Sequence, residues 1–247
     1  MVRLSECMLY RDFRYGEVLY EMAGLLAAGK SRADGDAKGS NSECEKLRET
    51  YFSCVNKLLE MAGLYGFEGN LWHCYLTFLL VNHENTFSTA CEIRGEVSGS
   101  VNDIALHDFG VFRELFSYDI TDFDWLGDHP CLEKLLHYEN VGTESKIYNS
   151  RIRDRICSLS KKLAGDETAQ EFMSDMVQFY KDFGVGKFGL HKAFRIDHDS
   201  DGNVQIVPIT KIAHVQLEDL VGYEIPKQKL VENTACFVRG KKAHTCL

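Results

Sequence analysis

The pattern of apolar and polar positions along the chain changes once, near Gly184. Before that point apolar residues recur three and four positions apart, which is the spacing of a helix with one buried face. Because the whole chain contains only three prolines, long helices are free to form. The expected helices span residues 13–28, 47–63, 71–80, 101–116, 130–137, 143–165 and 166–183. The sequence therefore predicts a mainly α fold, with a helical bundle as its first domain.

Local signals refine this prediction. Asp128 and Thr143 are each expected to cap a helix, because a short polar side chain can accept a bond from a free backbone N–H in the first turn, and Asp166 is expected to open another. Residues 71–80 are apolar on more than one face, which is typical of a helix at the centre of a bundle. Residues 30–43 contain no apolar side chain larger than alanine, so we expect a mobile loop there.

After Gly184 the period shortens to two. Two short strand-like runs, joined by a cluster of turn-forming residues, predict a small β-hairpin over residues 193–209. The turn carries alternating carboxylates followed by a glycine, namely Asp197, Asp199, Asp201 and Gly202.

Such a run can wrap a calcium ion. An EF-hand loop would need a bidentate Glu at its twelfth position, and that position is Pro208. It would also need a helix on each side, whereas strands are expected here. A polar hairpin turn is the favoured interpretation, and no metal site is predicted.

Composition narrows the range of partners. The chain has 247 residues, 45% of them hydrophobic, which is enough for one large or two modest domains with a real core. Its net charge is −9, and an acidic balance disfavours a surface that neutralises phosphates. We therefore expect no nucleic-acid partner.

The cysteines indicate a reducing compartment. Nine are scattered singly, without a C-x-x-C pair, and no secretory signal precedes them. Reduced thiols in the cytosol are expected, most of them acting as small buried hydrophobes. The longest apolar stretch, residues 71–81, is too short for a membrane span. The sequence thus predicts a soluble, cytoplasmic protein that does not contact a membrane.

Two pairs of neighbours suggest chemistry at first sight, His73 beside Cys74 and His107 beside Asp108. Adjacent residues of a helix point to different faces, so neither pair is expected to work as base and nucleophile, and structural roles are favoured. A helical enzyme with a site around His73, His83 and Glu84 remains an open alternative, although no orienting third group emerges at helical spacing.

A stretch rich in acidic and aromatic residues, 117–129, is a candidate partner-binding loop because it mixes Phe123 and Trp125 with carboxylates. The favoured interpretation is a connection between helices whose aromatic side chains pack inward.

The last part of the chain follows a different plan. Pro226 is expected in the first turn of a helix that ends at Gly240, and residues 243–247 have the composition of a buried strand. The apolar positions of that helix are Leu230, Val231 and Phe237. A helix, a basic turn and a strand are how a nucleotide-binding α/β module begins.

In detail, LVGYEIPKQKLVENTACFVRGKKAHTCL (220–247), with GKFGLHKAFRI (186–196), resembles the opening of an AAA-superfamily module. More narrowly it resembles a bacterial family of predicted ATPases whose cellular function is uncharacterised. The resemblance implies that Leu220, Val221, Gly222 and Tyr223 pack beside an adenine base. It also implies that the phosphate loop, the Mg-binding carboxylates and the arginine finger would follow Leu247.

No phosphate loop, dinucleotide fingerprint, nucleophile elbow or H-E-x-x-H pair occurs in the chain. No catalytic residue and no cofactor are therefore expected in this chain, whereas ATP and Mg are expected in an intact ATPase. The expected organisation is a helical domain over residues 1–184, a hairpin linker over 185–213, and the first helix and strand of an AAA-type module over 214–247.

The predicted function is that of a non-catalytic N-terminal region of a bacterial AAA-type ATPase. Such a region would recruit a protein partner or substrate, or support self-association of the ATPase ring. The alternative is a self-standing helical interaction scaffold with no nucleotide role.

Overall fold

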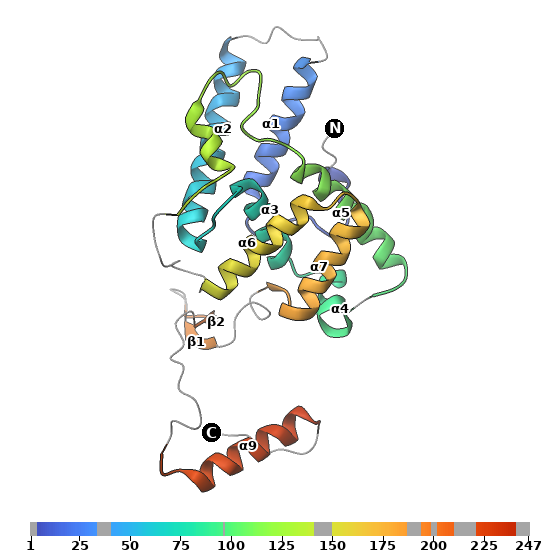
Figure 1. Cartoon of the computed structure of the whole chain (residues 1–247), viewed down its shortest axis with the longest axis vertical. Helices are drawn as coiled ribbons and strands as arrows, with labels where there is room; N and C mark the ends of the chain where they lie inside the picture. Colours follow the sequence, from blue (N-terminus) through green and yellow to red (C-terminus); the bar gives the residue numbers. More distant parts are fainter. Residues whose placement is uncertain are drawn as a thin grey trace. The chain divides into compact units, whose positions relative to one another are not determined.

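The computed structural model of the chain describes residues 4–33, 41–95, 97–140, 150–186, 194–198, 202–209 and 221–240. The fold is mainly helical, with one antiparallel sheet of two strands among these residues (Figure 1). The chain forms two compact units, Met1–Thr210 and Lys211–Leu247. The predicted mainly α fold is confirmed, whereas the AAA-type module stays a prediction, as do the predicted domain boundaries.

The first unit contains nearly all the regular elements. Its helices are η1 (Leu4–Glu6), α1 (Glu17–Ala33), α2 (Asn41–Tyr65), α3 (Leu71–Asn82), α4 (Thr86–Arg94), α5 (Ser100–Phe116), η2 (Pro130–Leu135), α6 (Ser150–Gly165) and α7 (Ala169–Phe183). Its strands are β1 (Phe194–His198) and β2 (Val204–Pro208), and the second unit holds α9 (Glu224–Val238).

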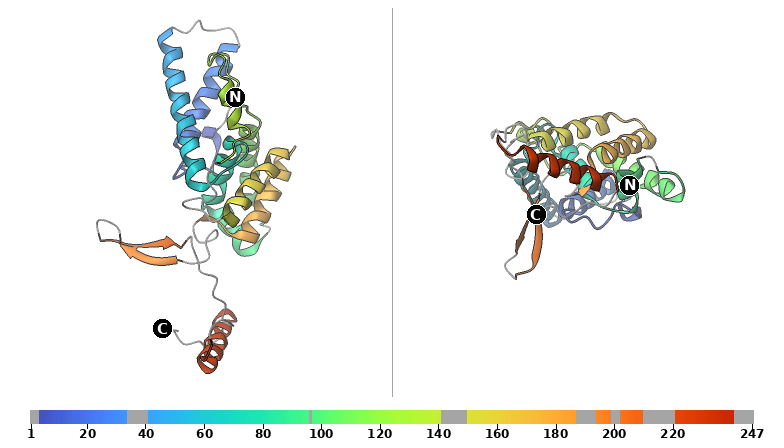
Figure 2. Two further views of the ribbon diagram at one scale, coloured as in Figure 1. Left: turned by 60° about the vertical axis from the view of Figure 1, so that its left-hand side comes forward. Right: turned by 90° about the horizontal axis from the view of Figure 1, so that it is seen from below.

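Helix α3 lies at the centre of the bundle, as its sequence predicts. Ten of its twelve residues are buried, and it packs against α2, α5 and α6 (Figure 2). The side chain of Asn70 begins the helix by accepting a bond from the N–H of His73 at 3.1 Å. A helix that is apolar on all faces is stable in water only where other helices surround it.

The other helices pack in pairs around α3. Helix α1 packs on α2, α4 and α5 pack on α7, and α6 packs on both α3 and α7 (Figure 1). The apolar stripe of α7 is buried at Phe172, Met176, Phe179 and Tyr180, whereas Met173 and Phe183 are partly buried. The core that results is rich in aromatic rings and draws its buried residues from positions 4–185.

A buried tyrosine pair links the N-terminal segment to this core. The hydroxyl oxygens of Tyr10 and Tyr180 lie 3.0 Å apart, and Tyr180 donates to the carbonyl of Leu80 at 2.9 Å. Both hydroxyls are satisfied although both side chains are fully buried. Three segments far apart in sequence are thereby connected, because Leu80 belongs to α3 and Tyr180 to α7.

Several predicted boundaries are wrong. Helix α1 continues to Ala33 and α2 begins at Asn41, so both ends of the loop expected over residues 30–43 are helical, and residues 34–40 lie outside the described ranges. Helix α4 was not predicted, because its nine residues are too few to show a clear period. It is fixed at its start by a capping box between Asn85 and Ser88.

The predicted cap at Asp128 and the predicted helix start at Asp166 are also wrong, and the predicted cap at Thr143 is untested. The segment after Asp128 is a 3-10 helix that starts from His129 without a side-chain cap bond. Helix α7 is capped by Thr168 instead of Asp166, because Thr168 and Glu171 form a reciprocal capping box. Thr143 lies outside the described residues, and the described part of α6 begins at Ser150.

The predicted hairpin is confirmed. Strands β1 and β2 pair antiparallel, with Ile196 opposite Ile206 and His198 opposite Val204. Asp197 belongs to β1, whereas Asp199 and Asp201 lie outside the described residues, so the turn that they form stays a prediction. Across the described ranges no helix has both the length and the apolar character needed to cross a membrane.

Candidate functional site

The predicted adenine-contact residues lie just before α9. Val221 and Gly222 form a turn, and Tyr223 occupies the N-cap position of the helix, where its carbonyl accepts a bond from the N–H of Lys227 at 2.9 Å. Gly222 has φ near 90°, a left-handed conformation that favours glycine. The fourth predicted residue, Leu220, lies outside the described ranges. The structure thus brings three of the four together at one helix terminus.

These residues offer apolar surface rather than charge. The side chains of Val221 and Tyr223 are 87% and 64% exposed. A tyrosine ring and a small aliphatic group provide a flat, apolar contact for a heteroaromatic base. The nearby Lys227 ammonium is paired with Glu224 at 2.9 Å. The chemistry available here is therefore apolar contact, and the nucleotide role itself stays a prediction.

Helix α9 has an exposed apolar face. Leu230, Val231, Phe237 and Val238 are 44%, 50%, 74% and 78% exposed, and their i, i+1, i+7 and i+8 spacing places them on one side of the helix. Within the described ranges α9 buries none of its side chains. An isolated helix of this length is marginal in water, so a further layer is needed to stabilise it.

The structure separates the residues of the alternative site, His73, His83 and Glu84, into two places. His73 and His83 are ten residues apart, at the start of α3 and just after its end, so about 15 Å of helix axis separates them. His73 Nε2 lies 2.8 Å from the carbonyl oxygen of Phe116, and the two rings stack. Burial lowers the pKa of His73, which favours its neutral form. His73 is a structural histidine, as the favoured interpretation predicts.

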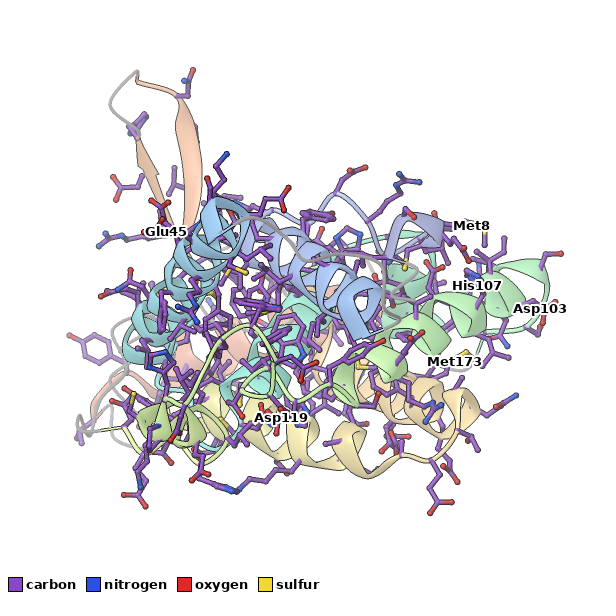
Figure 3. The ribbon with its side chains drawn as sticks, turned by 90° about the horizontal axis from the view of Figure 1, so that it is seen from above. Met8, Glu45, Asp103, His107, Asp119 and Met173 are labelled. Atoms are coloured by element: carbon purple, nitrogen blue, oxygen red, sulfur yellow. The ribbon has the colours of Figure 1, made fainter. Side chains whose placement is uncertain are left out.

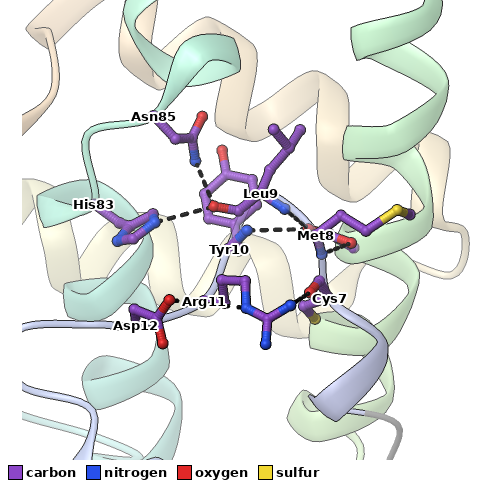
Figure 4. Close-up of polar contacts among 9 residues, drawn as sticks. Cys7, Met8, Leu9, Tyr10, Arg11, Asp12, His83 and Asn85 are labelled. Carbon is purple, nitrogen blue, oxygen red and sulfur yellow. Dashed lines mark hydrogen bonds and ion pairs between the residues drawn. The ribbon is translucent and has the colours of Figure 1, made fainter.

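His83 lies in a different environment. It lines a cavity of about 410 Å³ with Glu84, and the other lining residues are Asp12, Phe13, Arg14, Tyr15, Leu79 and Asn82. Its Nε2 is 3.0 Å from the carbonyl oxygen of Leu9, to which Asn85 also donates at 3.4 Å (Figure 4). Burial lowers the pKa of His83. The imidazole thus holds the N-terminal segment, and among the described residues no hydrogen bond joins it to Glu84.

The neighbours His107 and Asp108 contact each other, contrary to the argument from helix faces. His107 belongs to α5 (Figure 3), and its Nδ1 lies 3.1 Å from Asp108 Oδ1. Asp108 is fully buried and accepts bonds from three consecutive backbone N–H groups, those of Met8, Leu9 and Tyr10, at 3.0, 2.7 and 3.0 Å from Oδ2. The pair therefore anchors the N-terminal segment on α5.

The sequence does contain one sign of this anchor. Asp108 stands in the apolar stripe of α5, between the buried Ala105 and Phe112. A carboxylate at such a position is retained only when donors satisfy it, because an unpaired buried charge is costly. Its donors come from about a hundred residues upstream, which no local pattern reveals.

The aromatic stretch 117–129 packs inward, which confirms the favoured interpretation. The side chains of Phe123 and Trp125 are only 9% and 7% exposed, and both rings meet Tyr51 of α2 edge-on. Arg48 donates to the carbonyl of Trp125 at 3.0 Å. These aromatic groups stabilise the fold and are not available to a partner.

The cysteines differ in environment. Burial is the main cause of the raised pKa of the Cys7 and Cys54 thiols, about 12 in each case, and it raises that of Cys91 to about 11, so these three are inert small hydrophobes, as predicted. Cys131 is exposed. Cys74 is buried with a second thiol beside it, and Cys246 lies outside the described residues.

In a comparison with known proteins, one family matches the C-terminal part of the chain. Residues 189–247 are similar to the family described as "Protein of unknown function (DUF815)". No curated protein and no solved structure matches the chain. The matched segment includes the hairpin and α9, whereas the helical bundle lies outside it.

Proposed function

We propose that the chain is a non-catalytic N-terminal region of a bacterial AAA-type ATPase, which recruits a protein partner or substrate, or supports self-association of the ring. Its helical bundle would present the recruiting surface. Residues 221–240 would form the first layer of the ATPase module, with Val221, Gly222 and Tyr223 beside the adenine base. ATP and Mg would be held by the intact protein.

The observation that carries this proposal is the exposed apolar face of α9. The face lies within residues 189–247, the part that is similar to one family, and in the segment that resembles the opening of an AAA module. In an α/β module a helix of this kind packs its apolar side on a sheet. The exposed Leu230, Val231, Phe237 and Val238 are therefore explained as a contact surface for strands that would follow in the intact protein.

The chemistry of the described residues supports a non-catalytic role. Phosphoryl transfer needs backbone amides and a lysine around the β- and γ-phosphates, and a metal held by Ser or Thr and Asp. Stacking of a base on Tyr223 supplies none of these. Such a contact alone contributes at most about 4 kcal/mol, which corresponds to millimolar binding.

The test is to extend the protein beyond Leu247 along its gene and to measure ATP hydrolysis. We expect a G-x-x-x-x-G-K loop in the extension, and ATP turnover by the extended protein but not by the 247-residue chain. Tyr223→Ala should weaken ATP binding by the extended protein several-fold. Tyr20→Ala, which removes a half-exposed ring from α1, should leave ATP binding unchanged. An extension with neither the loop nor turnover would contradict the proposal.

The second candidate is a self-standing helical scaffold with no nucleotide role. It is favoured by the position of the core, whose buried residues come from positions 4–185. The same experiment separates the two candidates. For a scaffold, the extended protein would show no turnover, and ATP would change neither its unfolding temperature nor the capture of its partner.

A further inference from the structure

Two cysteines meet where α6 packs on the central helix. Cys74 belongs to α3 and Cys157 to α6, and these two helices are in direct contact. The two thiols lie within interaction range of each other. Cys74 is fully buried, whereas Cys157 is only partly buried, at the edge of the core. Cys157 is thus the more accessible residue of the pair.

The surrounding atoms fix this arrangement. Cys74 Sγ lies 3.4 Å from the carbonyl oxygen of Glu68 and 3.5 Å from Ser160 Oγ. Ser160 follows Cys157 by one helical turn and donates to the carbonyl of Cys157 at 3.1 Å. The contact with Ser160 therefore places the Cys74 side chain against the face of α6 that carries Cys157, independently of the interaction between the thiols.

The pair is electrostatically unequal. The interaction with Cys157 and burial raise the pKa of the Cys74 thiol. The pKa of Cys157 is lowered, first by the interaction with Cys74, then by a backbone bond from Glu68 and by the charge of Arg153, and burial opposes these effects. Cys157 is thus the more acidic thiol of the pair. Cys91 is buried without such a neighbour, and its pKa is raised.

We propose that Cys74 and Cys157 form a dithiol modification site, which a hydroperoxide such as hydrogen peroxide oxidises to a disulfide that joins α3 to α6. This site is independent of the proposed nucleotide role. In the first step the Cys157 thiolate attacks one peroxide oxygen, the O–O bond breaks, and Cys157 becomes a sulfenic acid while hydroxide leaves.

In the second step the sulfur of Cys74 attacks the sulfenic sulfur of Cys157. An S–S bond forms, the S–O bond breaks, and the departing oxygen leaves as water with the proton of the Cys74 thiol. In total two thiols are oxidised and one peroxide is reduced to two waters. The disulfide would fasten α6 covalently to the most buried helix of the bundle.

The experiment treats the folded 247-residue chain with hydrogen peroxide, blocks remaining thiols, and maps the products by mass spectrometry without reduction. The expected result is a loss of two hydrogen atoms and a linked peptide pair that contains Cys74 and Cys157. Cys157→Ser should abolish the link. Cys131→Ser and Cys91→Ser, which remove an exposed and an isolated buried thiol, should leave it unchanged.

A second measurement follows the sulfenic acid with a dimedone probe. In the wild type Cys74 resolves the sulfenic acid quickly, so little adduct accumulates at Cys157, whereas in Cys74→Ala the adduct should become the main product. If that variant does not fold, the peptide map of the wild type decides alone. Oxidation that stops at Cys157 without a bond to Cys74, a link between other cysteines, or no reaction in the folded protein would overturn the proposal.

Discussion

Helices α7 and α9 have fifteen residues each, and both were expected from the sequence, yet they differ in almost everything that packing decides. Helix α7 starts with a reciprocal capping box and buries four side chains in the aromatic core. Helix α9 starts at Tyr223 without a side-chain cap bond and, within the described residues, buries none. The comparison shows that periodicity specifies a helix, whereas its stability comes mainly from the layer on which it packs.

The largest expected effect is the contrast between one phenylalanine from each helix. Phe172 of α7 is fully buried and its ring lies near Phe109 and Phe116, so Phe172→Ala should lower the free energy of unfolding by about 3–5 kcal/mol. Phe237 of α9 is 74% exposed, and Phe237→Ala should change it by less than about 0.5 kcal/mol. Urea unfolding followed by circular dichroism measures both.

A large loss of stability in Phe237→Ala would contradict the difference between α7 and α9, because it would mean that the apolar face of α9 is already covered in the isolated chain. In an extended protein with a complete ATPase module, we expect the two substitutions to lower the free energy of unfolding by similar amounts. The pair of variants thus reports on whether α9 has its layer.

The second effect concerns the anchor of the N-terminal segment. Asp108→Asn replaces a carboxylate oxygen that faces three backbone donors by an amide, so it should lower the free energy of unfolding by about 2 kcal/mol. Asp103→Asn removes an exposed carboxylate from the same helix and should have little effect. Hydrogen exchange at the amides of Met8, Leu9 and Tyr10 should accelerate only in the first variant. Unchanged exchange there would refute the role of Asp108 as an anchor.

Local patterns predict what depends on neighbours in sequence. The sequence was sufficient to predict the helices that contain Phe116, Leu163 and Phe179, the central position of α3, and the hairpin. Each of these depends on a spacing of apolar residues that is visible within a short stretch of sequence. Thr168 also has a local signature, a Glu three residues later, which the Asp at 166 obscured.

The remaining features depend on distant partners. Asp108 meets residues about a hundred positions upstream, and Cys74 meets Cys157 across the packing of α3 on α6. Neither spacing has a local signature, so the sequence indicates the residue types without their partners. The candidate site near Tyr223 could be proposed from a resemblance alone, because the chemistry that would define it involves groups outside the described residues.

The smallest expected effect is a pH dependence of stability that arises at the junction between α6 and α7. Burial and the nearby carboxylates of Asp175 and Glu171 raise the pKa of Asp166 from 3.8 to about 6. Among the described residues, Asp166 Oδ2 and Asp175 Oδ2 are buried without a hydrogen-bond partner. The folded state therefore binds more protons than the unfolded state between these two values, and the contribution of Asp166 to stability falls as the pH rises through this window.

Asp166→Asn should remove this contribution. The unfolding temperature of the wild type relative to this variant should fall as the pH rises from about 4 to about 6 and stay constant above that range. Asp103→Asn, the exposed control, should follow the wild type throughout. A wild type that gains stability relative to Asp166→Asn over the same range would show that the ionised form of Asp166 is the favoured one. The negative charge at the junction before α7 would then stabilise the folded state instead of destabilising it. The difference between the start of α7 and the start of α9 would be greater than the structure indicates.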